Sequence, residues 1–166
     1  LKKENDAFWN ANERRAKAER LGLTIPEVIT LASIVEEETN YQPEKSRVAG
    51  LYLNRLRKGI RLQSDPTVKF ALIDFALNRI LFEHLKVDDP YNTYKYAGLP
   101  PGPIRLPSVA TIDAVLNAEK HNYIYMCAHP DFNGTHNFAV TLAEHNRNAA
   151  KYHVALRKWL ADKKKK

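Results

Sequence analysis

Three consecutive glutamates, Glu36, Glu37 and Glu38, close an apolar stretch of this chain. A carboxyl group held against apolar surface has its charged form disfavoured, so its pKa rises. A carboxylic acid that keeps its proton near neutral pH can donate that proton to a leaving group. The stretch therefore predicts general acid catalysis, and the question is which glutamate is placed for it.

The apolar stretch before the glutamates has the pattern of an amphipathic helix. Thr24 and Glu27 form a capping box with Pro26 in the first turn, which predicts a helix that begins near Thr24. At about 100° per residue, its apolar side chains define one broad buried arc. The arc consists of Val28, Leu31, Ala32, Ile34 and Val35.

The three glutamates project in different directions from this helix. Glu37 lies opposite the buried arc and should be solvated, whereas Glu36 falls inside the arc and Glu38 falls at its other edge. Glu36 and Glu38 both remain candidates for a buried acid. The competing structural interpretation is that these acids pair with nearby cations such as Lys45 or Arg47, since perturbed acids are often structural.

Further polar clusters occur where elements are expected to begin or end. They are Arg61–Thr67, Tyr91–Tyr94 with the Pro-rich Gly98–Pro103, and His136–Phe138 with His145 and Asn146. Each has a structural interpretation, since Asp65, for example, would act as a helix N-cap worth about 1 kcal/mol. Together they resemble a sugar-binding cleft, which needs amide and hydroxyl partners and aromatic faces for pyranose rings.

The elements that position these clusters are mostly helical. Helices are expected over about 1–20, 24–39, 43–58, 65–85, 109–120 and 141–160, and strands over 60–62, 123–128 and 137–140, with a turn at Asn133-Gly134. The Pro- and Gly-rich segment 86–107 is expected to be an ordered functional loop. The pattern predicts an α+β domain, predominantly helical, with a small antiparallel sheet.

Length and composition fit one domain with a real core. The 166 residues are 44% hydrophobic and 27% charged, and no apolar run approaches the roughly 20 residues that span a bilayer. The single cysteine, Cys127, excludes an internal disulfide and is expected to be a small core residue.

The formal net charge is +7, and Lys163–Lys166 form a basic tail. Such a surface could attract nucleic acid, anionic lipid or an anionic cell-wall glycan, but no nucleic-acid-binding motif is present.

Six motifs in this order resemble the MltG/YceG-like endolytic murein transglycosylases. They are Leu-Ala-Ser-Ile-Val-Glu-x-Glu-Thr (31–39), Asn54–Leu56, Leu62–Thr67, Tyr91–Tyr94, Gly98–Ile104 and Glu144–Asn146. The match runs from about residue 20 to residue 155, nearly the whole chain. The chain departs from the family pattern at Pro107-Ser108 and at His129-Pro130-Asp131, where the family usually has a shorter turn.

The resemblance implies a lysozyme-like catalytic domain that cleaves the β-1,4 bond between N-acetylmuramic acid and N-acetylglucosamine in peptidoglycan without water. The product would carry a 1,6-anhydro-muramic end. The family match selects Glu36 as the acid and then the base, with Glu38 as a supporting acid, and it requires no metal or other cofactor. Substrate contacts are expected from Gln63, Ser64, Asp65, Thr67, Tyr91, Asn92, Tyr94, His136 and Asn137.

The resemblance also implies where this domain works. We expect residues 1–166 to be one catalytic domain, with a helix at 1–20 and a tail at 163–166, excised from a longer membrane-anchored protein. It would act at the extracytoplasmic (periplasmic) face of the bacterial inner membrane, with peptidoglycan strands and cell-wall synthases as partners, no nucleic acid, and membrane contact only through the anchor. The alternatives are a muramidase-type hydrolase with a second carboxylate such as Asp65, a non-catalytic peptidoglycan-binding or scaffold domain, and a nucleic-acid binder.

Overall fold

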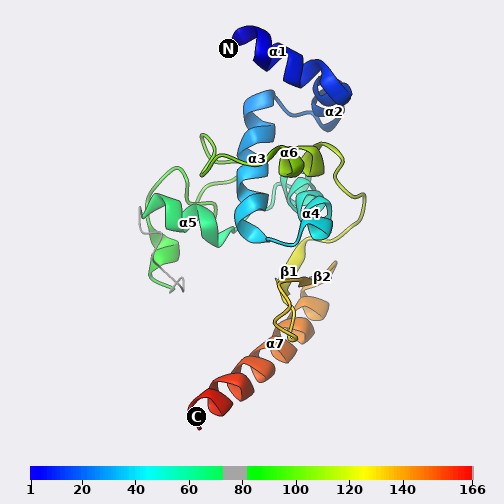
Figure 1. The fold of residues 1–166 in the computed structure, drawn as a ribbon. Helices are drawn as coiled ribbons and strands as arrows, with labels where there is room; N and C mark the ends of the chain where they lie inside the picture. The colour runs from blue at the N-terminus through cyan, green and yellow to red at the C-terminus, as the bar shows by residue number, and fades with distance from the viewer. Residues whose placement is uncertain (73–81, 166) are drawn as a thin grey trace.

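Helix α3 (Ile25–Glu38) is the central element of the fold, and it packs against α4 (Lys45–Lys58) and α6 (Val109–Leu116) (Figure 1). The computed structural model describes residues 1–72 and 82–165. The predicted capping box is confirmed, because Thr24 accepts a hydrogen bond from the Glu27 amide and Glu27 accepts one from the Thr24 amide. The predicted arc of α3 is fully buried and forms the core with the apolar faces of α4 and α6.

Helix α4 follows a short 3-10 turn, η2 (Gln42–Glu44), and ends at Gly59, as the sequence predicts. Gly59 has φ +68°, a left-handed conformation that favours glycine at the end of a helix. Gly50, in the middle of α4, serves a different purpose. A Cβ there would lie 2.3 Å from the carbonyl oxygen of Glu119, so the segment after α6 passes directly over α4.

Helix α5 (Asp65–Ala71) begins where the sequence places it, although two local expectations are wrong. Ser64, not Asp65, is the N-cap residue, and within the described part of the chain residues 60–62 form no strand. The helix predicted over 65–85 includes residues 73–81, which lie outside the described residues. The end of the predicted range overlaps a short 3-10 helix, η3 (His84–Lys86). The segment from 87 to 108 is ordered loop, as predicted.

Strands β1 (Tyr125–Ala128) and β2 (His136–Ala139) form the expected antiparallel hairpin, with Tyr125 opposite Ala139. Helix α7 (Leu142–Lys163), capped by Thr141, packs on this hairpin and then extends away from the helical body (Figure 1). None of its described residues is buried. Within 1–72 and 82–165, no helix combines the length and the hydrophobicity needed to cross a bilayer.

The single helix predicted over 1–20 is wrong. The chain forms α1 (Lys2–Asn10), the 3-10 turn η1 (Ala11–Glu13) and α2 (Arg14–Leu21), because Asn12 and Glu13 adopt positive φ values of 53° and 57°. Buried Arg14 ties this segment to α6 by donating two hydrogen bonds to Asp113, at 2.8 and 3.1 Å. The charged pattern of the first 20 residues does not reveal this break.

Candidate active site

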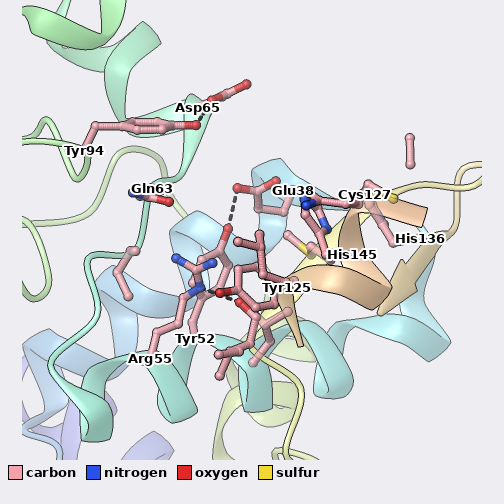
Figure 2. Close-up of a pocket in the computed structure, with 17 residues that line it drawn as sticks. Glu38, Tyr52, Arg55, Gln63, Asp65, Tyr94, Tyr125, Cys127, His136 and His145 are labelled. Atoms are coloured by element: carbon pink, nitrogen blue, oxygen red, sulfur yellow. Dashed lines mark hydrogen bonds between the residues drawn. The ribbon is translucent and has the colours of Figure 1, made fainter. Parts of the chain in front are cut away.

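A pocket of about 530 Å³ opens where the end of α3 meets α4, the start of α5, the hairpin and the start of α7 (Figure 2). We call it the acid pocket. Its polar and aromatic lining residues are Glu38, Tyr52, Arg55, Gln63, Asp65, Tyr94, Tyr125, His136, His145 and Asn146. The lining therefore combines one carboxyl group from α3 with hydrogen-bonding groups and aromatic rings from five other segments.

Glu38, the last residue of α3, is held by two hydroxyl groups. Tyr52 Oη donates to Oε1 of Glu38 at 2.6 Å, and Ser64 Oγ donates to the same oxygen at 2.7 Å. Oε2 accepts no hydrogen bond found among residues 1–72 and 82–165. One carboxyl oxygen is therefore fixed by the protein, and the other is available to a ligand in the acid pocket.

Burial raises the pKa of Glu38 above its ordinary value of 4.5, and the hydrogen bonds from Tyr52 and Ser64 oppose this rise only in part. The nearby Asp65 carboxylate acts in the same direction as burial. Burial also raises the pKa of Tyr52 well above 10, so its hydroxyl keeps its hydrogen and remains a donor. The arrangement favours a protonated acid that becomes a stabilised carboxylate once it has given up its proton.

Removing the Tyr52 hydroxyl should make Glu38 a weaker acid. In a Tyr52→Phe variant the carboxylate loses a hydrogen bond, so the pKa of Glu38 rises further. Any activity that needs protonated Glu38 falls as pH rises through this pKa, so the alkaline limb of the pH–rate profile should move to higher pH. The profile is measured beside Tyr96→Phe, a matched change at an exposed hydroxyl outside the lining. An alkaline limb that stays in place or moves to lower pH contradicts this role of Tyr52.

Glu36 has a different environment. Its carboxylate forms an ion pair with Lys45 and accepts hydrogen bonds from the Thr111 hydroxyl and, at 3.1 Å, from the Ser108 amide. Burial alone would raise the pKa of Glu36, but these donors outweigh it and lower the pKa to about 2. The expectation that Glu36 holds its proton is therefore wrong, and the structural interpretation, pairing with Lys45, is confirmed.

Glu37 and Arg47, the other acid and cation considered from the sequence, each form an ion pair with a residue outside α3. Glu37 is exposed, as predicted, and pairs with Arg105 at 2.8 Å. Arg47 pairs with Glu119 rather than with a glutamate of α3. Because residues two apart on a helix point about 200° from each other, Glu36 and Glu38 face nearly opposite sides of α3 and cannot serve one site.

Gln63, Asp65 and Tyr94 lie where the sequence predicts, along the acid pocket. Tyr94 Oη donates to Oδ1 of Asp65 at 2.5 Å, across 29 positions of the chain (Figure 2). Gln63 has φ +52°, a strained conformation for a residue other than glycine, and its side chain is exposed. These three residues form one wall of the pocket.

Ser64, Thr67 and Asn92, which were predicted to contact substrate, do not line the acid pocket. All three are buried. The Thr67 hydroxyl donates to the carbonyl of Ser64 and lies 2.9 Å from the hydroxyl of Thr93, which accepts from the Ser64 amide. Asn92 donates to two carbonyl groups of the preceding loop. Their polar groups are used by the chain itself.

Of the other residues predicted to contact substrate, one lines the acid pocket and two do not. Tyr91 packs against Phe70 with ring centroids 4.6 Å apart and does not line the acid pocket. His136 lines the acid pocket. Asn137, which lies opposite Cys127 in the hairpin, does not line it. Cys127, expected in the core, is only half-buried and lines the pocket.

Arg55 was given no role in the site by the sequence, and His145 was placed in a polar cluster of the expected cleft but not among the predicted substrate contacts. Buried Arg55 donates to the carbonyl oxygens of Ile124 and Arg61, at 2.7 and 2.8 Å, and so joins β1 to the wall of the acid pocket. His145 stacks on Tyr125 with ring centroids 5.2 Å apart, and its Nδ1 atom is buried without a hydrogen-bond partner among the described residues. Burial lowers the pKa of His145, which favours a neutral ring able to bind a ligand hydroxyl or amide.

A carboxyl group whose pKa is raised by burial, in a pocket lined by amide, hydroxyl and aromatic side chains, has the chemistry of a saccharide-processing site. The family model of the YceG-like family matches residues 1–151, and the chain belongs to this family. A crystal structure of a YceG-like protein from Listeria monocytogenes superposes with a TM-score of 0.75 at 37% identity, over 83% of this chain and 44% of that one. The α+β, predominantly helical class predicted from the sequence is thereby confirmed.

Two curated relatives carry the name endolytic murein transglycosylase. The relative from Bacillus subtilis (strain 168) is 38% identical over 130 residues, which cover 78% of this chain and 35% of the relative. The relative from Streptococcus pneumoniae serotype 2 (strain D39) is 34% identical over 134 residues, which cover 78% of this chain and 24% of the relative. The chain thus spans about a third or less of the length of these curated relatives.

Proposed function

We propose that this chain is the catalytic part of an endolytic murein transglycosylase, with Glu38 as its general acid and base. The name that the curated relatives carry supports the reaction class. The observation that carries the proposal is the placement of Glu38, whose pKa is raised and whose Oε1 is fixed by Tyr52 and Ser64 in a pocket with sugar-binding chemistry. Glu36 is ionised in an ion pair and is not given this role.

The proposed reaction needs only one carboxyl group from the protein. Protonated Glu38 donates its proton to the glycosidic oxygen as the bond from the anomeric carbon of N-acetylmuramic acid breaks. The 2-acetamido group of the same sugar stabilises the developing positive charge, as in substrate-assisted cleavage. Ionised Glu38 then takes the proton from the C6 hydroxyl, whose oxygen attacks the anomeric carbon. The acid is restored, the 1,6-anhydro ring is closed, and no water is consumed.

The hydroxyl groups of Tyr52 and Ser64 act on the ionised form of Glu38, which exists between the two proton transfers. They donate to Glu38 most strongly when it is a carboxylate, because hydrogen bonds to charged groups are stronger than neutral ones. They therefore stabilise the state that exists after proton donation. His145, whose ring lines the acid pocket and stacks on Tyr125, is the side chain we assign to hold a sugar hydroxyl or acetamido group.

Asp65 is the residue that would support a second candidate function, hydrolysis of the same glycan. It lines the same pocket, and a hydrolase would use it as the second carboxylate that retaining and inverting glycosidases require. Its Oδ1 already accepts the Tyr94 hydroxyl, which favours a positioning role instead. The mass of the products separates the two reactions.

The test is digestion of purified peptidoglycan by this chain, followed by mass spectrometry of the released fragments. The transglycosylase reaction gives muramic ends that are one water lighter than hydrolytic ends. Ends of full hydrolytic mass would instead show a muramidase with Asp65 as the second carboxylate. Binding of the glycan with no new ends would show a non-catalytic scaffold.

We further propose that the protein acts outside the cytoplasm, because its proposed substrate is the cell wall. The relatives' name supports this coarse location. An N-terminal anchor at the inner membrane and association with cell-wall synthases remain expectations from the family resemblance.

A further inference from the structure

A second hollow adjoins the acid pocket on the far side of Glu38. Its volume is about 570 Å³, and three of its lining residues, Glu38, Ala128 and His136, also line the acid pocket. The other lining residues are Thr39, Asn40, Tyr41, His129, Phe132, Asn133, Gly134, Thr135 and Tyr152. We call it the hairpin pocket, because the β1–β2 turn supplies much of its lining. The two hollows therefore meet at the carboxyl group.

The hairpin pocket offers aromatic faces and amide groups. Tyr41 and Phe132 are 48% and 45% exposed, so both rings present a face to a ligand in this pocket. Phe132 is held at φ +52° and packs its ring against Tyr152, with centroids 5.8 Å apart. Strained backbone of this kind persists where the surrounding structure fixes it, and it clusters at ligand sites.

The junction between the two pockets is held by hydrogen bonds to one buried carboxylate. Glu44, only 6% exposed, accepts the His136 amide at 2.8 Å and lies 2.8 Å from His136 Nδ1. The same carboxylate accepts the Thr39 hydroxyl at 3.2 Å, so it joins the end of α3 to the start of β2. Because a carboxylate accepts hydrogen bonds, Nδ1 of His136 is the donor, and Nε2, which forms no hydrogen bond within residues 1–72 and 82–165, can bind a ligand in either pocket.

We infer that the hairpin pocket binds the glycan strand beyond the cleaved bond, so that the strand crosses Glu38 from one pocket into the other. This inference rests on the proposed function and adds to it a second binding site and its ligand, sugar units stacked on Tyr41 and Phe132. A carboxyl group in the middle of a groove, with sugar sites on both sides, cuts within a strand rather than only at its end.

The test uses binding rather than cleavage. A Glu38→Gln chain is titrated calorimetrically with stem-peptide-free murein fragments, from the disaccharide to the octasaccharide. Affinity should rise with length until both pockets are filled. Adding Phe132→Ala or Tyr41→Ala should weaken binding of the longest fragment about tenfold, because each change removes one stacked ring. Phe82→Ala, a matched change at a ring that is 83% exposed and outside both linings, is the control.

The outcomes separate this inference from the proposed function. If both variants bind the longest fragment as tightly as the Phe82→Ala control, the hairpin pocket is not a sugar site and the inference is overturned. It is also overturned if the loss occurs only with fragments that carry stem peptides, because the pocket would then bind peptide. If the Glu38→Gln chain binds no fragment of any length, the proposed function fails as well. Phe132 and Tyr41 lie on different segments, so a loss in both supports the inference and is not explained by one distorted loop.

Discussion

A Glu38→Gln chain should cleave peptidoglycan at least 10²- to 10⁴-fold more slowly than the unaltered chain, the range typical for loss of a general acid or base. Glutamine keeps the shape of the side chain and can still accept the hydrogen bonds of Tyr52 and Ser64. It cannot deliver a proton to the glycosidic oxygen or remove one from the C6 hydroxyl. Both halves of the proposed cycle are therefore lost in one substitution.

The same variant should be at least as stable as the unaltered chain. Burial raises the pKa of Glu38, so above its unfolded pKa the carboxylate costs folding free energy that a neutral amide does not. Urea unfolding near neutral pH should therefore show an equal or higher midpoint. Lost activity without lost stability distinguishes a catalytic residue from a structural one.

Two matched changes on the same helix complete this experiment. Glu37→Gln alters an exposed glutamate whose partner is Arg105, and it should leave cleavage unchanged. Glu36→Gln should lower stability while the folded fraction still cleaves. If the rate instead collapses in folded Glu36→Gln and survives in Glu38→Gln, the assignment of the acid to Glu38 is wrong.

Breaking the ion pair between Glu36 and Lys45 should destabilise the region around α3. Both side chains are nearly buried, at 12% and 8% exposure, so removing one partner leaves the other charge without compensation. Lys45→Met should therefore cost about 3–5 kcal/mol in the free energy of unfolding. The double variant Glu36→Gln/Lys45→Met should recover much of that loss. Glu119→Gln, at the exposed pair with Arg47, should cost less than about 1 kcal/mol.

The same pair sets an acid-sensitive part of the stability. The pKa of Glu36 falls from 4.5 to about 2 on folding, so its contribution is complete above about pH 4.5 and is lost as pH falls toward 2. The shift corresponds to about 3 kcal/mol. In Glu36→Gln this part of the pH dependence should disappear from urea unfolding measured across that range. A variant with the same acid dependence as the unaltered chain would contradict the assigned ion pair.

The helices of the core were predictable because each carries local signals. Thr24 and Glu27 begin α3, Gly59 ends α4, and Ser108 caps α6, as the sequence indicates. The break at Asn12 was not predictable, since neither it nor its neighbour has a side chain that demands positive φ. Local chemistry identifies caps, but it does not identify a kink imposed by packing.

The sequence allowed us to predict which residues are candidates for the site, but not which role each of them has. Helical periodicity correctly left both Glu36 and Glu38 facing protein, yet it could not say what lies opposite each of them. Thr111 and Ser108, which stabilise the charge on Glu36, are more than 70 positions away. The partners Tyr52 and Ser64 of Glu38 are also distant in sequence, so the difference between the two acids exists only in the folded chain.

The order in which the chain supplies its parts has a biological consequence. Glu38 and its hydroxyl partners Tyr52 and Ser64 lie in the first 64 residues, whereas His136 and His145 come from the last third. A newly made chain therefore completes its cutting site only when its final hairpin and helix have docked. Copies that lack the hairpin and α7 would hold Glu38, Tyr52 and Ser64 without the residues that close the acid pocket around them.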